Sequence, residues 1–423
     1  MNMNVKTTFL RLDRRVPGVL YQPEQTCPQS RIAVVVMHSD EDYLDSPTGE
    51  ELAKRGFMVL CANVMVKEGL FFHQFEKMKA VKAAVSYLRS CPGVEKIILM
   101  GHSGGATLMT SYQAIAENGV EIFQGEEKII PHPDCGQLPP ADGIMLFDAN
   151  WGNAAMQLFS LEPAVIDEQS GMKLDEALNL FNPANGFDPN GSTFPQEFID
   201  RFQKAQGARN NRILTHALDR LAAIERGEGF YSDDEPLVVP GADQNFMNNK
   251  LYAQDVRLMS HTKQQRKLIH ADGSITEEVV RSVRKPENPV SLTHSLGEGG
   301  RIMTVKNYLT SYAVRTLDSY GYGEDGVWGV DWDSTYNCPV GNVKHIKVPL
   351  LVVGMTAGWE YLASETIYEQ AASSDKDIAF VEGANHKFYP ASNCEEYPGQ
   401  FGDTMKLLHD YAAAWLTHTG RFD

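Results

Sequence analysis

Residues 96–112 read KIILMGHSGGATLMTSY, an apolar run that ends in Gly-His-Ser-Gly-Gly and continues into small and apolar residues. The apolar run is typical of a buried strand, and the residues after the glycines are typical of a helix. Two interpretations compete for Ser103 between these glycines. The first is a tight strand-to-helix turn, in which glycine supplies a positive φ or lets the two elements pack closely. The second is a nucleophile elbow, a strained turn that exposes the serine hydroxyl at the top of a sheet.

Short apolar runs alternate with helical patterns on both sides of this stretch, which is typical of parallel βαβ units. Strands are expected at 31–37, 57–64, 97–100, 143–147, 350–354 and 378–382. Helices are expected from Pro47 to Lys54 with Ser46 as N-cap, over 73–90, from about Gly104 onward, over 195–226 and over 404–416. The pattern predicts an α/β fold with a mostly parallel sheet flanked by helices.

Between about residues 150 and 345 this alternation breaks. The segment contains the long helical pattern at 195–226 and two loop-like stretches rich in Gly and Asp, at 182–192 and 321–334. A segment of this size with a long helical pattern is typical of a folded insertion and not of a linker. We therefore expect a cap that covers a site and excludes water. The predicted division is a core made of 1–149 and 346–423, with a cap domain at 150–345.

Aromatic residues in and beside the predicted cap are a further feature of the sequence. They are Trp151, Phe187, Tyr320, Tyr322, Trp328 and Trp332. Such side chains can line an apolar pocket, although they more often pack in a core or against a loop.

The composition excludes several classes of protein. The formal net charge of −17 leaves no basic footprint for nucleic acid and repels anionic membranes. No apolar stretch reaches the roughly 20 residues of a membrane span, and residues 1–18 lack the apolar segment of a signal peptide. The six cysteines are scattered without zinc-like spacing, which favours a reducing compartment. We therefore expect a cytoplasmic protein without nucleic-acid or membrane partners; a homo-oligomer is compatible with these features.

A serine hydroxyl is a weak nucleophile until a histidine accepts its proton and a carboxylate orients that histidine. In the elbow interpretation Ser103 is the nucleophile. His386 lies in VEGANHKFYP, after the last expected strand, which is where an elbow-bearing α/β fold presents its base. The sequence therefore predicts Ser103 and His386 as nucleophile and base.

Three carboxylates compete for the role of the acid. Glu360 is the favoured candidate because it lies in the loop after the strand at 350–354, where the acid of such a triad is expected. Asp148, at the end of an earlier strand, is the alternative. Glu365 is the third candidate, although a carboxylate that opens a helix often only complements the helix dipole.

Acyl transfer also requires N–H donors aimed at the developing oxyanion. One candidate is the backbone N–H of Gly104, directly after Ser103. The second is expected from the loop after the strand at 31–37, where the candidates are the N–H groups of Ser39 and Asp40.

Five stretches together resemble the α/β-hydrolase superfamily, in particular large, cap-bearing serine hydrolases of the bacterial and fungal esterase type. They are VVVMHSDEDYLDSPTGEELAKRG (34–56), GHSGG (101–105), FNPANGF (181–187), AQGARNNRI (205–213) and VEGANH (381–386). The resemblance implies the α/β-hydrolase fold and a serine mechanism that needs no metal and no cofactor. The chain departs from the family pattern at Ser39, where glycine is usual, and at Gly358, near which aspartate is usual.

We expect a hydrolase that cleaves a small, neutral or apolar carboxylic ester or lactone through an acyl-enzyme. The same fold also hosts amide hydrolases, C–C bond hydrolases and noncatalytic ligand-binding proteins, which remain as alternatives. No phosphate-binding loop or dinucleotide fingerprint with the required strand–turn–helix context competes with this interpretation.

Overall fold

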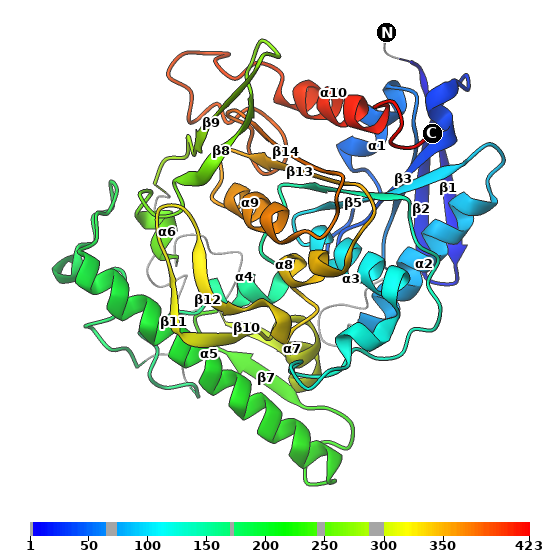
Figure 1. Ribbon diagram of the computed structural model, residues 1–423. Coiled ribbons are helices and arrows are strands. Elements are labelled where there is room, and N and C mark those ends of the chain that lie inside the picture. Colours follow the sequence, from blue (N-terminus) through cyan, green and yellow to red (C-terminus); the bar gives the residue numbers. More distant parts are fainter. Residues whose placement is uncertain (1–2, 65–73, 170–172, 243–249, 287–299) are drawn as a thin grey trace.

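The computed structural model describes residues 3–64, 74–169, 173–242, 250–286 and 300–423. A ten-stranded sheet forms its centre, with the strand order β1-β2-β4-β3-β5-β6-β13-β14-β8-β9 (Figure 1). The strands are β1 (Val5–Asp13), β2 (Val16–Pro23), β3 (Ile32–Val36), β4 (Met58–Ala62), β5 (Lys96–His102), β6 (Gly143–Phe147), β8 (His261–Ile269), β9 (Ile275–Arg281), β13 (Leu350–Met355) and β14 (Lys376–Val381). From β4 to β8 all neighbouring strands pair in parallel, and antiparallel hairpins, β1–β2 and β8–β9, form the two edges. The predicted α/β class with a mostly parallel sheet is confirmed.

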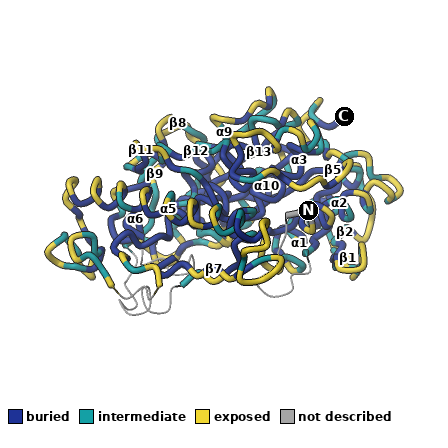
Figure 2. Tube along the Cα trace, turned by 90° about the horizontal axis from the view of Figure 1, so that it is seen from below, coloured by how far each residue is buried: buried dark blue, intermediate teal, exposed yellow. Residues whose placement is uncertain are grey.

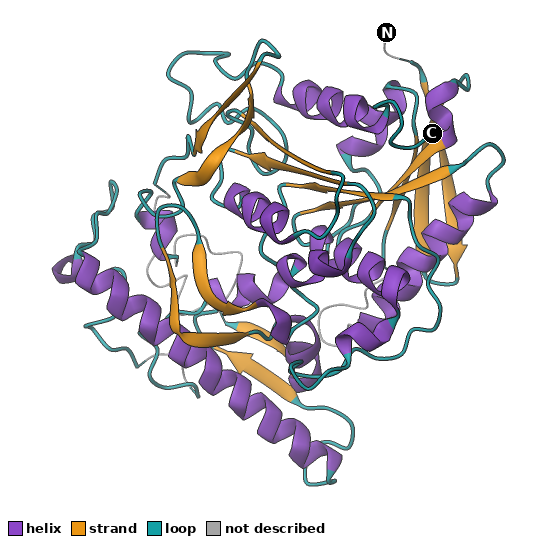
Figure 3. Cartoon of the chain, in the orientation of Figure 1, coloured by secondary structure: helices purple, strands orange, loops and turns teal. Residues whose placement is uncertain are grey.

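The two faces of the sheet carry separate cores, because successive side chains of a strand point to opposite faces. In β3, Val34 and Val36 pack on the side covered by two helices, α1 (Pro47–Lys54) and α10 (Thr404–Leu416). Ala33 and Val35 pack on the other side, against α2 (Gln74–Ser90) and α3 (Gly105–Asn118). Helices therefore cover both faces of the sheet (Figure 3).

Burial in the molecule follows the sheet. The central strand residues are dark blue in Figure 2, and exposed residues gather at turns and at the outer ends of elements. All five residues of β3 and all five of β6 are buried. None of the helices in the described ranges is both long and apolar enough to cross a bilayer.

The core elements agree closely with the sequence pattern. The six expected strands correspond to β3, β4, β5, β6, β13 and β14, and β6 has the expected bounds. Helix α1 begins at Pro47 and ends at Lys54 as expected, although the Ser46 side chain makes no capping hydrogen bond. Apolar periodicity and helix-start signals are strong for these elements because each buries one face against the sheet.

The segment between β6 and β13 builds most of a second layer. Its helices are α4 (Asn153–Phe159), α5 (Gln196–Glu225), α6 (Leu251–Gln254), α7 (Val305–Ser311) and α8 (Pro339–Asn342), and its shorter strands are β7 (Pro236–Val239), β10 (Arg301–Thr304), β11 (Arg315–Tyr322) and β12 (Val327–Asp331). Helix α5 packs with β7, β10 and α7 around a small apolar core of its own. In Figure 1 these elements lie together on one side of the central sheet.

One part of the predicted cap belongs to the central sheet instead. Strand β8 pairs in parallel with β14, with Leu268 opposite Phe380, and β9 follows it as the edge strand. The domain prediction of a cap over 150–345 is therefore wrong for residues 261–281. Strand β8, the second strand from the edge, reads HTKQQRKLI, and its many polar side chains hide the apolar signal of a strand. The rest of the predicted division stays a prediction.

Candidate active site

Ser103 lies in a strained turn between β5 and α3. Its φ is +53°, a left-handed conformation that non-glycine residues seldom adopt. Its backbone N–H donates to the carbonyl oxygen of Phe147 at 3.3 Å, which ties the turn to the end of β6. Strain of this kind persists where the surrounding structure imposes it, and such positions cluster at functional sites.

The glycines around Ser103 are required by close packing. A Cβ on Gly101 would lie 2.6 Å from the carbonyl oxygen of Gly105, and a Cβ on Gly105 would lie 2.6 Å from that of Met37. The positive φ therefore belongs to the serine, while the glycines let strand, helix and neighbouring loop approach each other. This is the geometry of a nucleophile elbow, and it lies at the end of β5, a central strand of the ten-stranded sheet.

The chain has the α/β-hydrolase fold. No protein-family model and no curated protein matches the sequence. Several solved structures resemble the chain at low sequence identity. A soluble variant of monoglyceride lipase from Saccharomyces cerevisiae is 9% identical, with 98% of this chain and 95% of the lipase covered and a TM-score of 0.43. The siderophore hydrolase EstB from Aspergillus fumigatus is 10% identical, with 98% of each chain covered and a TM-score of 0.42. A hypothetical protein from Pseudomonas aeruginosa is 11% identical, with 98% and 93% covered and a TM-score of 0.43.

The turn that carries His386 lies against the turn that carries Ser103. After β14, the Phe388 N–H donates to the carbonyl oxygen of Asn385 at 2.8 Å, so that His386 lies inside a tight turn. His102, the residue before Ser103, has its Nε2 atom 2.7 Å from the His386 carbonyl oxygen. The structure thus brings the loops of Ser103 and His386 side by side.

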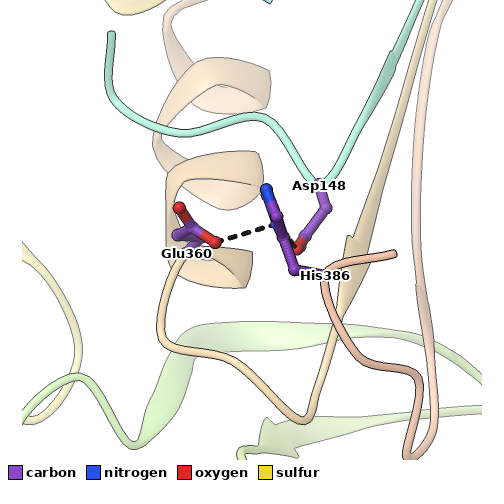
Figure 4. Close-up of side chains that lie close together, drawn as sticks. All are labelled: Asp148, Glu360 and His386. Carbon is purple, nitrogen blue, oxygen red and sulfur yellow. Dashed lines mark hydrogen bonds and ion pairs between the residues drawn. The ribbon is translucent and has the colours of Figure 1, made fainter. Parts of the chain in front are cut away.

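Two carboxylates reach the same nitrogen of His386. Its Nδ1 atom lies 2.7 Å from Oδ2 of Asp148 and 2.9 Å from Oε2 of Glu360 (Figure 4). Asp148 directly follows β6, and Glu360 directly precedes α9 (Tyr361–Gln370). The favoured acid and its alternative from the sequence are therefore both present at one histidine.

Asp148 is the more firmly held of the two carboxylates. Its side chain is completely buried, and its second oxygen, Oδ1, accepts the backbone N–H of Met355 at 2.9 Å. Its own N–H donates to the Val353 carbonyl oxygen at 2.7 Å, and its φ is +40°. Burial raises the pKa of Asp148, and the hydrogen bond from His386 opposes this rise. Both oxygens are thus engaged and the carboxylate has one orientation.

Glu360 is held less tightly, and Glu365 lies elsewhere. The Glu360 side chain is 14% exposed and meets His386 through one oxygen. The Glu365 carboxylate accepts the N–H groups of Lys263 and Gln264 at 2.7 and 3.1 Å and pairs with an arginine of β8. The prediction of Glu365 as the third candidate is wrong, because its carboxylate binds the edge hairpin to α9.

The electrostatics of the site favour a protonated His386. Burial by itself lowers the pKa of this imidazole, but the charge of Glu360 and the hydrogen bonds to Asp148 and Glu360 outweigh burial. The net result is a His386 pKa well above its usual value. The site therefore stabilises the imidazolium that a base forms when it accepts a proton.

The candidate oxyanion donors fall into two groups. The N–H groups of Asp40 and Glu41 donate to Nδ1 of His38 at 3.1 and 3.0 Å. The prediction of Asp40 as a donor is therefore wrong, because its N–H already has an acceptor. Within the described ranges, no hydrogen bond engages the N–H of Ser39 or of Gly104.

A polar network holds Ser39 beside Gly104. The Ser39 hydroxyl donates to Oδ2 of Asp40 at 2.6 Å, and Nδ2 of Asn153 donates to the same oxygen at 2.9 Å. The buried Lys77 ammonium lies 3.1 Å from Oδ1 of Asp40. Burial alone would raise the pKa of Asp40, but the Lys77 charge and the Ser39 hydrogen bond lower it to about 2.

Sequence reasoning missed Asn153 and Lys77. They lie on α4 and α2, about 114 and 38 positions from Ser39, and no local motif connects them to it. A polar residue at the start of a helix just after β6 was the only available signal. A cavity of about 220 Å³ opens beside this network, lined by residues 38–42, Asn63 and Val64.

The cluster of His386, Asp148 and Glu360 has the residue types of a metal site. Its potential ligand atoms lie within 4.8 Å of one another. Around a tetrahedral ion with ligands at about 2.0–2.1 Å, neighbouring ligand atoms lie about 3.3 Å apart. The separations of 2.7 and 2.9 Å are hydrogen-bond lengths, so this arrangement suits a shared proton better than a metal ion.

Aromatic side chains near Asp148 and Glu360 in the sequence pack against one another. Trp151 is stacked on Trp359, with ring centroids 6.2 Å apart, and Tyr252 lies 4.6 Å from Trp359. Trp151, Tyr320 and Tyr322 are buried in the main apolar core, whereas Trp328 is 47% exposed. The core-packing interpretation of these aromatics fits the first three residues.

Proposed function

We propose that the chain is a serine hydrolase that cleaves a carboxylic ester or lactone through an acyl-enzyme on Ser103. One observation carries the proposal: the strained elbow of Ser103 lies beside the turn of His386, whose Nδ1 meets the buried Asp148 carboxylate. Along the chain the proposed nucleophile Ser103 comes first, the orienting carboxylate Asp148 second and the base His386 last, which is the order of a Ser-Asp-His triad in this fold.

In the proposed first step, Nε2 of His386 accepts the proton of the Ser103 hydroxyl as its oxygen attacks the substrate carbonyl. The imidazolium that results is stabilised by Asp148 and Glu360 together. It then donates its proton to the leaving alkoxide, and the acyl group remains on Ser103. In a lactone this alkoxide stays attached to the acyl group.

The second step reverses the roles. His386 accepts a proton from water, the hydroxide attacks the acyl-enzyme, and the proton returns to Ser103 as the carboxylic acid leaves. In both steps the N–H groups of Gly104 and Ser39 are the proposed donors to the tetrahedral oxyanion. The network of Asp40 and Asn153 supports this by fixing the Ser39 loop.

We assign the acid role to Asp148 and a supporting role to Glu360. Full burial of the Asp148 side chain and hydrogen bonds to both of its oxygens support this assignment. It reverses the order expected from sequence position, where Glu360 was favoured.

The proposed substrate is small and neutral or apolar, because the net charge of −17 repels polyanions. The six cysteines all lie in the described ranges and none is paired in a disulfide, which supports a reducing, cytoplasmic setting.

The test is covalent labelling of Ser103. A fluorophosphonate is expected to add once to the unaltered protein, with the adduct on Ser103, and Ser103→Ala is expected to lose both the adduct and at least about 10³-fold in kcat. Ser373→Ala is the matched control, since this buried serine donates to the Asp375 carbonyl oxygen outside the site. An unlabelled but folded protein would contradict the serine mechanism and favour a noncatalytic binding role. A panel of esters, lactones, anilides and β-diketones then sorts ester hydrolysis from amide or C–C bond hydrolysis.

A further inference from the structure

His102 occupies a position between the nucleophile and the base that the catalytic scheme does not use. It is the last residue of β5 and is 5% exposed. Its Nε2 atom lies 2.7 Å from the His386 carbonyl oxygen, and its Nδ1 atom is hydrogen-bonded to the Tyr43 hydroxyl. Its ring also lies 4.6 Å from the ring of His386 and 4.6 Å from that of Phe388.

The partners of His102 determine where its protons are. A carbonyl oxygen only accepts, so Nε2 must carry the hydrogen that it donates to His386. Burial lowers the pKa of His102 far below its usual value, and positive charge on His386, His38 or Lys387 lowers it further. The imidazole is therefore neutral, its Nδ1 holds a lone pair, and the Tyr43 hydroxyl is the donor to that lone pair.

Tyr43 extends this chain to a third loop. It lies in the loop that contains Ser39, and its ring is stacked on His38 with centroids 4.8 Å apart. Its backbone N–H donates to Oδ1 of Asn63 at 2.8 Å. Burial raises the pKa of the Tyr43 hydroxyl, so the hydroxyl keeps its proton and remains a donor.

We propose that Tyr43 and His102 are positioning residues, a hydrogen-bonded strut that fixes the base-bearing turn of His386 relative to Ser103 and to the Ser39 loop. The inference rests on the proposed function, because it concerns how the proposed nucleophile and base meet. The strut takes no part in proton transfer. It acts through the His386 backbone, whose placement decides whether Nε2 of His386 reaches the serine hydroxyl.

The expected effects follow from this geometry. Displacements of about 1 Å in reacting groups can cost on the order of 10²-fold in rate. Loss of the strut is therefore expected to lower kcat and the rate of Ser103 labelling while KM changes by less than about threefold, because substrate contacts are untouched.

The first experiment compares two substitutions at His102. Glutamine places an amide N–H near the position of Nε2 and can still donate to the His386 carbonyl, whereas methionine fills similar space without a donor. We expect His102→Met to lose about 10²-fold in kcat and in fluorophosphonate labelling rate, and His102→Gln to lose less than about tenfold. Equal losses in the two folded variants would overturn the proposal, since they would show that the donor to the carbonyl is irrelevant.

The second experiment uses Tyr43→Phe, which removes a single oxygen and stays informative if His102→Met does not fold. We expect Tyr43→Phe to lower kcat about tenfold on its own. In a His102→Gln background the same change should cost less than about twofold. The reason is that the tyrosine fixes the tautomer of an imidazole, whereas the donor and acceptor atoms of an amide are fixed already. Full additivity of the two changes would overturn the proposal.

Tyr112→Phe is the matched control. Tyr112 is a fully buried tyrosine whose hydroxyl donates to the Pro139 carbonyl oxygen at 2.8 Å, away from the three loops. Its loss tests what removal of a buried hydroxyl does to stability alone, and we expect an unchanged kcat. If it lowers kcat as much as Tyr43→Phe does, the strut is overturned.

The outcomes separate the strut from the proposed function. If the unaltered protein is not labelled on Ser103, the proposed function fails and the strut fails with it. If the unaltered protein is labelled and His102→Met and Tyr43→Phe are labelled equally fast, the strut fails alone.

Discussion

The loop after β6 and the loop after β13 each deliver a carboxylate to Nδ1 of His386, yet they are built differently. The loop after β6 holds Asp148 at φ +40° with no exposed side-chain surface, and four residues later Gly152 has φ +114°. A Cβ on Gly152 would lie 2.2 Å from the Asn337 carbonyl oxygen. In the loop after β13, a Cβ on Gly358 would find nothing nearer than 3.8 Å, and Glu360 is partly exposed.

This difference in packing is the basis for proposing two different roles for the two carboxylates at one histidine. In the proposed reaction, the packed loop fixes its carboxylate beforehand, so little reorganisation is needed when charge develops on His386. The open loop contributes mainly charge, which acts over distance and needs no exact orientation. Distance to Nδ1 alone, 2.7 against 2.9 Å, would not separate them.

The largest expected effect is that of Asp148→Asn. An amide in this place cannot accept the Nδ1 proton and the Met355 N–H together, so His386 loses its tautomer and orientation. We expect kcat to fall by about 10³- to 10⁴-fold. Steady-state kinetics on a protein with unchanged circular dichroism measures this. Should Glu360→Gln cost more than Asp148→Asn, the ranking of the two loops is reversed.

Gly152→Ala probes the packing of the first loop directly. Its Cβ has to displace the Asn337 carbonyl oxygen, and its φ of +114° is strained for alanine. We expect the free energy of unfolding to fall by about 2–5 kcal/mol. Chemical denaturation measures this, and a loss below about 1 kcal/mol would show that the loop after β6 is as adaptable as the loop after β13.

Glu360→Gln is expected to act through charge. A pKa of His386 well above the usual value means that the neutral base, and with it kcat/KM, is lost as the pH falls through that raised value. Without the Glu360 charge this acidic limb moves to lower pH, and kcat falls by about tenfold as the imidazolium loses one partner. The pH profile of kcat/KM measures the shift.

Glu382→Gln is the matched control for this change, since Glu382 pairs with Nδ1 of His270 at 2.8 Å outside the site. We expect its pH profile to equal that of the unaltered protein. An acidic limb that stays in place in Glu360→Gln would show that Glu360 contributes no charge to the base.

Gly358→Ala should have the smallest effect. Its added methyl group enters open space and its φ lies outside the left-handed region. We expect the free energy of unfolding to change by less than about 0.5 kcal/mol and kcat by less than twofold. A large loss would mean that the loop after β13 is under the same constraint as the loop after β6.

The sequence predicted the central sheet well because its signals are local. Val34, Val35 and Val36 form a continuous apolar run, as strands buried on both faces do, and Pro47 sets the start of α1. The elbow was readable for the same reason: Gly101 and Gly105 stand at fixed offsets from Ser103.

The sequence could not predict which carboxylate is the acid, because that choice depends on how close the loops of Asp148, Glu360 and His386 lie to one another. Asp148 and Glu360 both follow apolar strands in the sequence, and only the pairing of β6 with β13 shows that their loops meet at one histidine. Nothing in the sequence indicated that the Asp40 N–H, a candidate oxyanion donor, donates to Nδ1 of His38. The strand of residues 261–269 was not predicted because its mostly polar side chains give no apolar strand pattern.

The pairing of β6 with β13 has a consequence for synthesis of the protein. Ile144 pairs with Leu350, so about 200 residues must leave the ribosome between the two neighbours. At about 5–20 residues per second, the edge of β6 waits on the order of 10–40 s for its partner. All five residues of β6, GIMLF, are buried in the finished sheet. During translation they form an apolar, unpaired edge, and this edge is where we expect chaperones to bind and aggregation to begin.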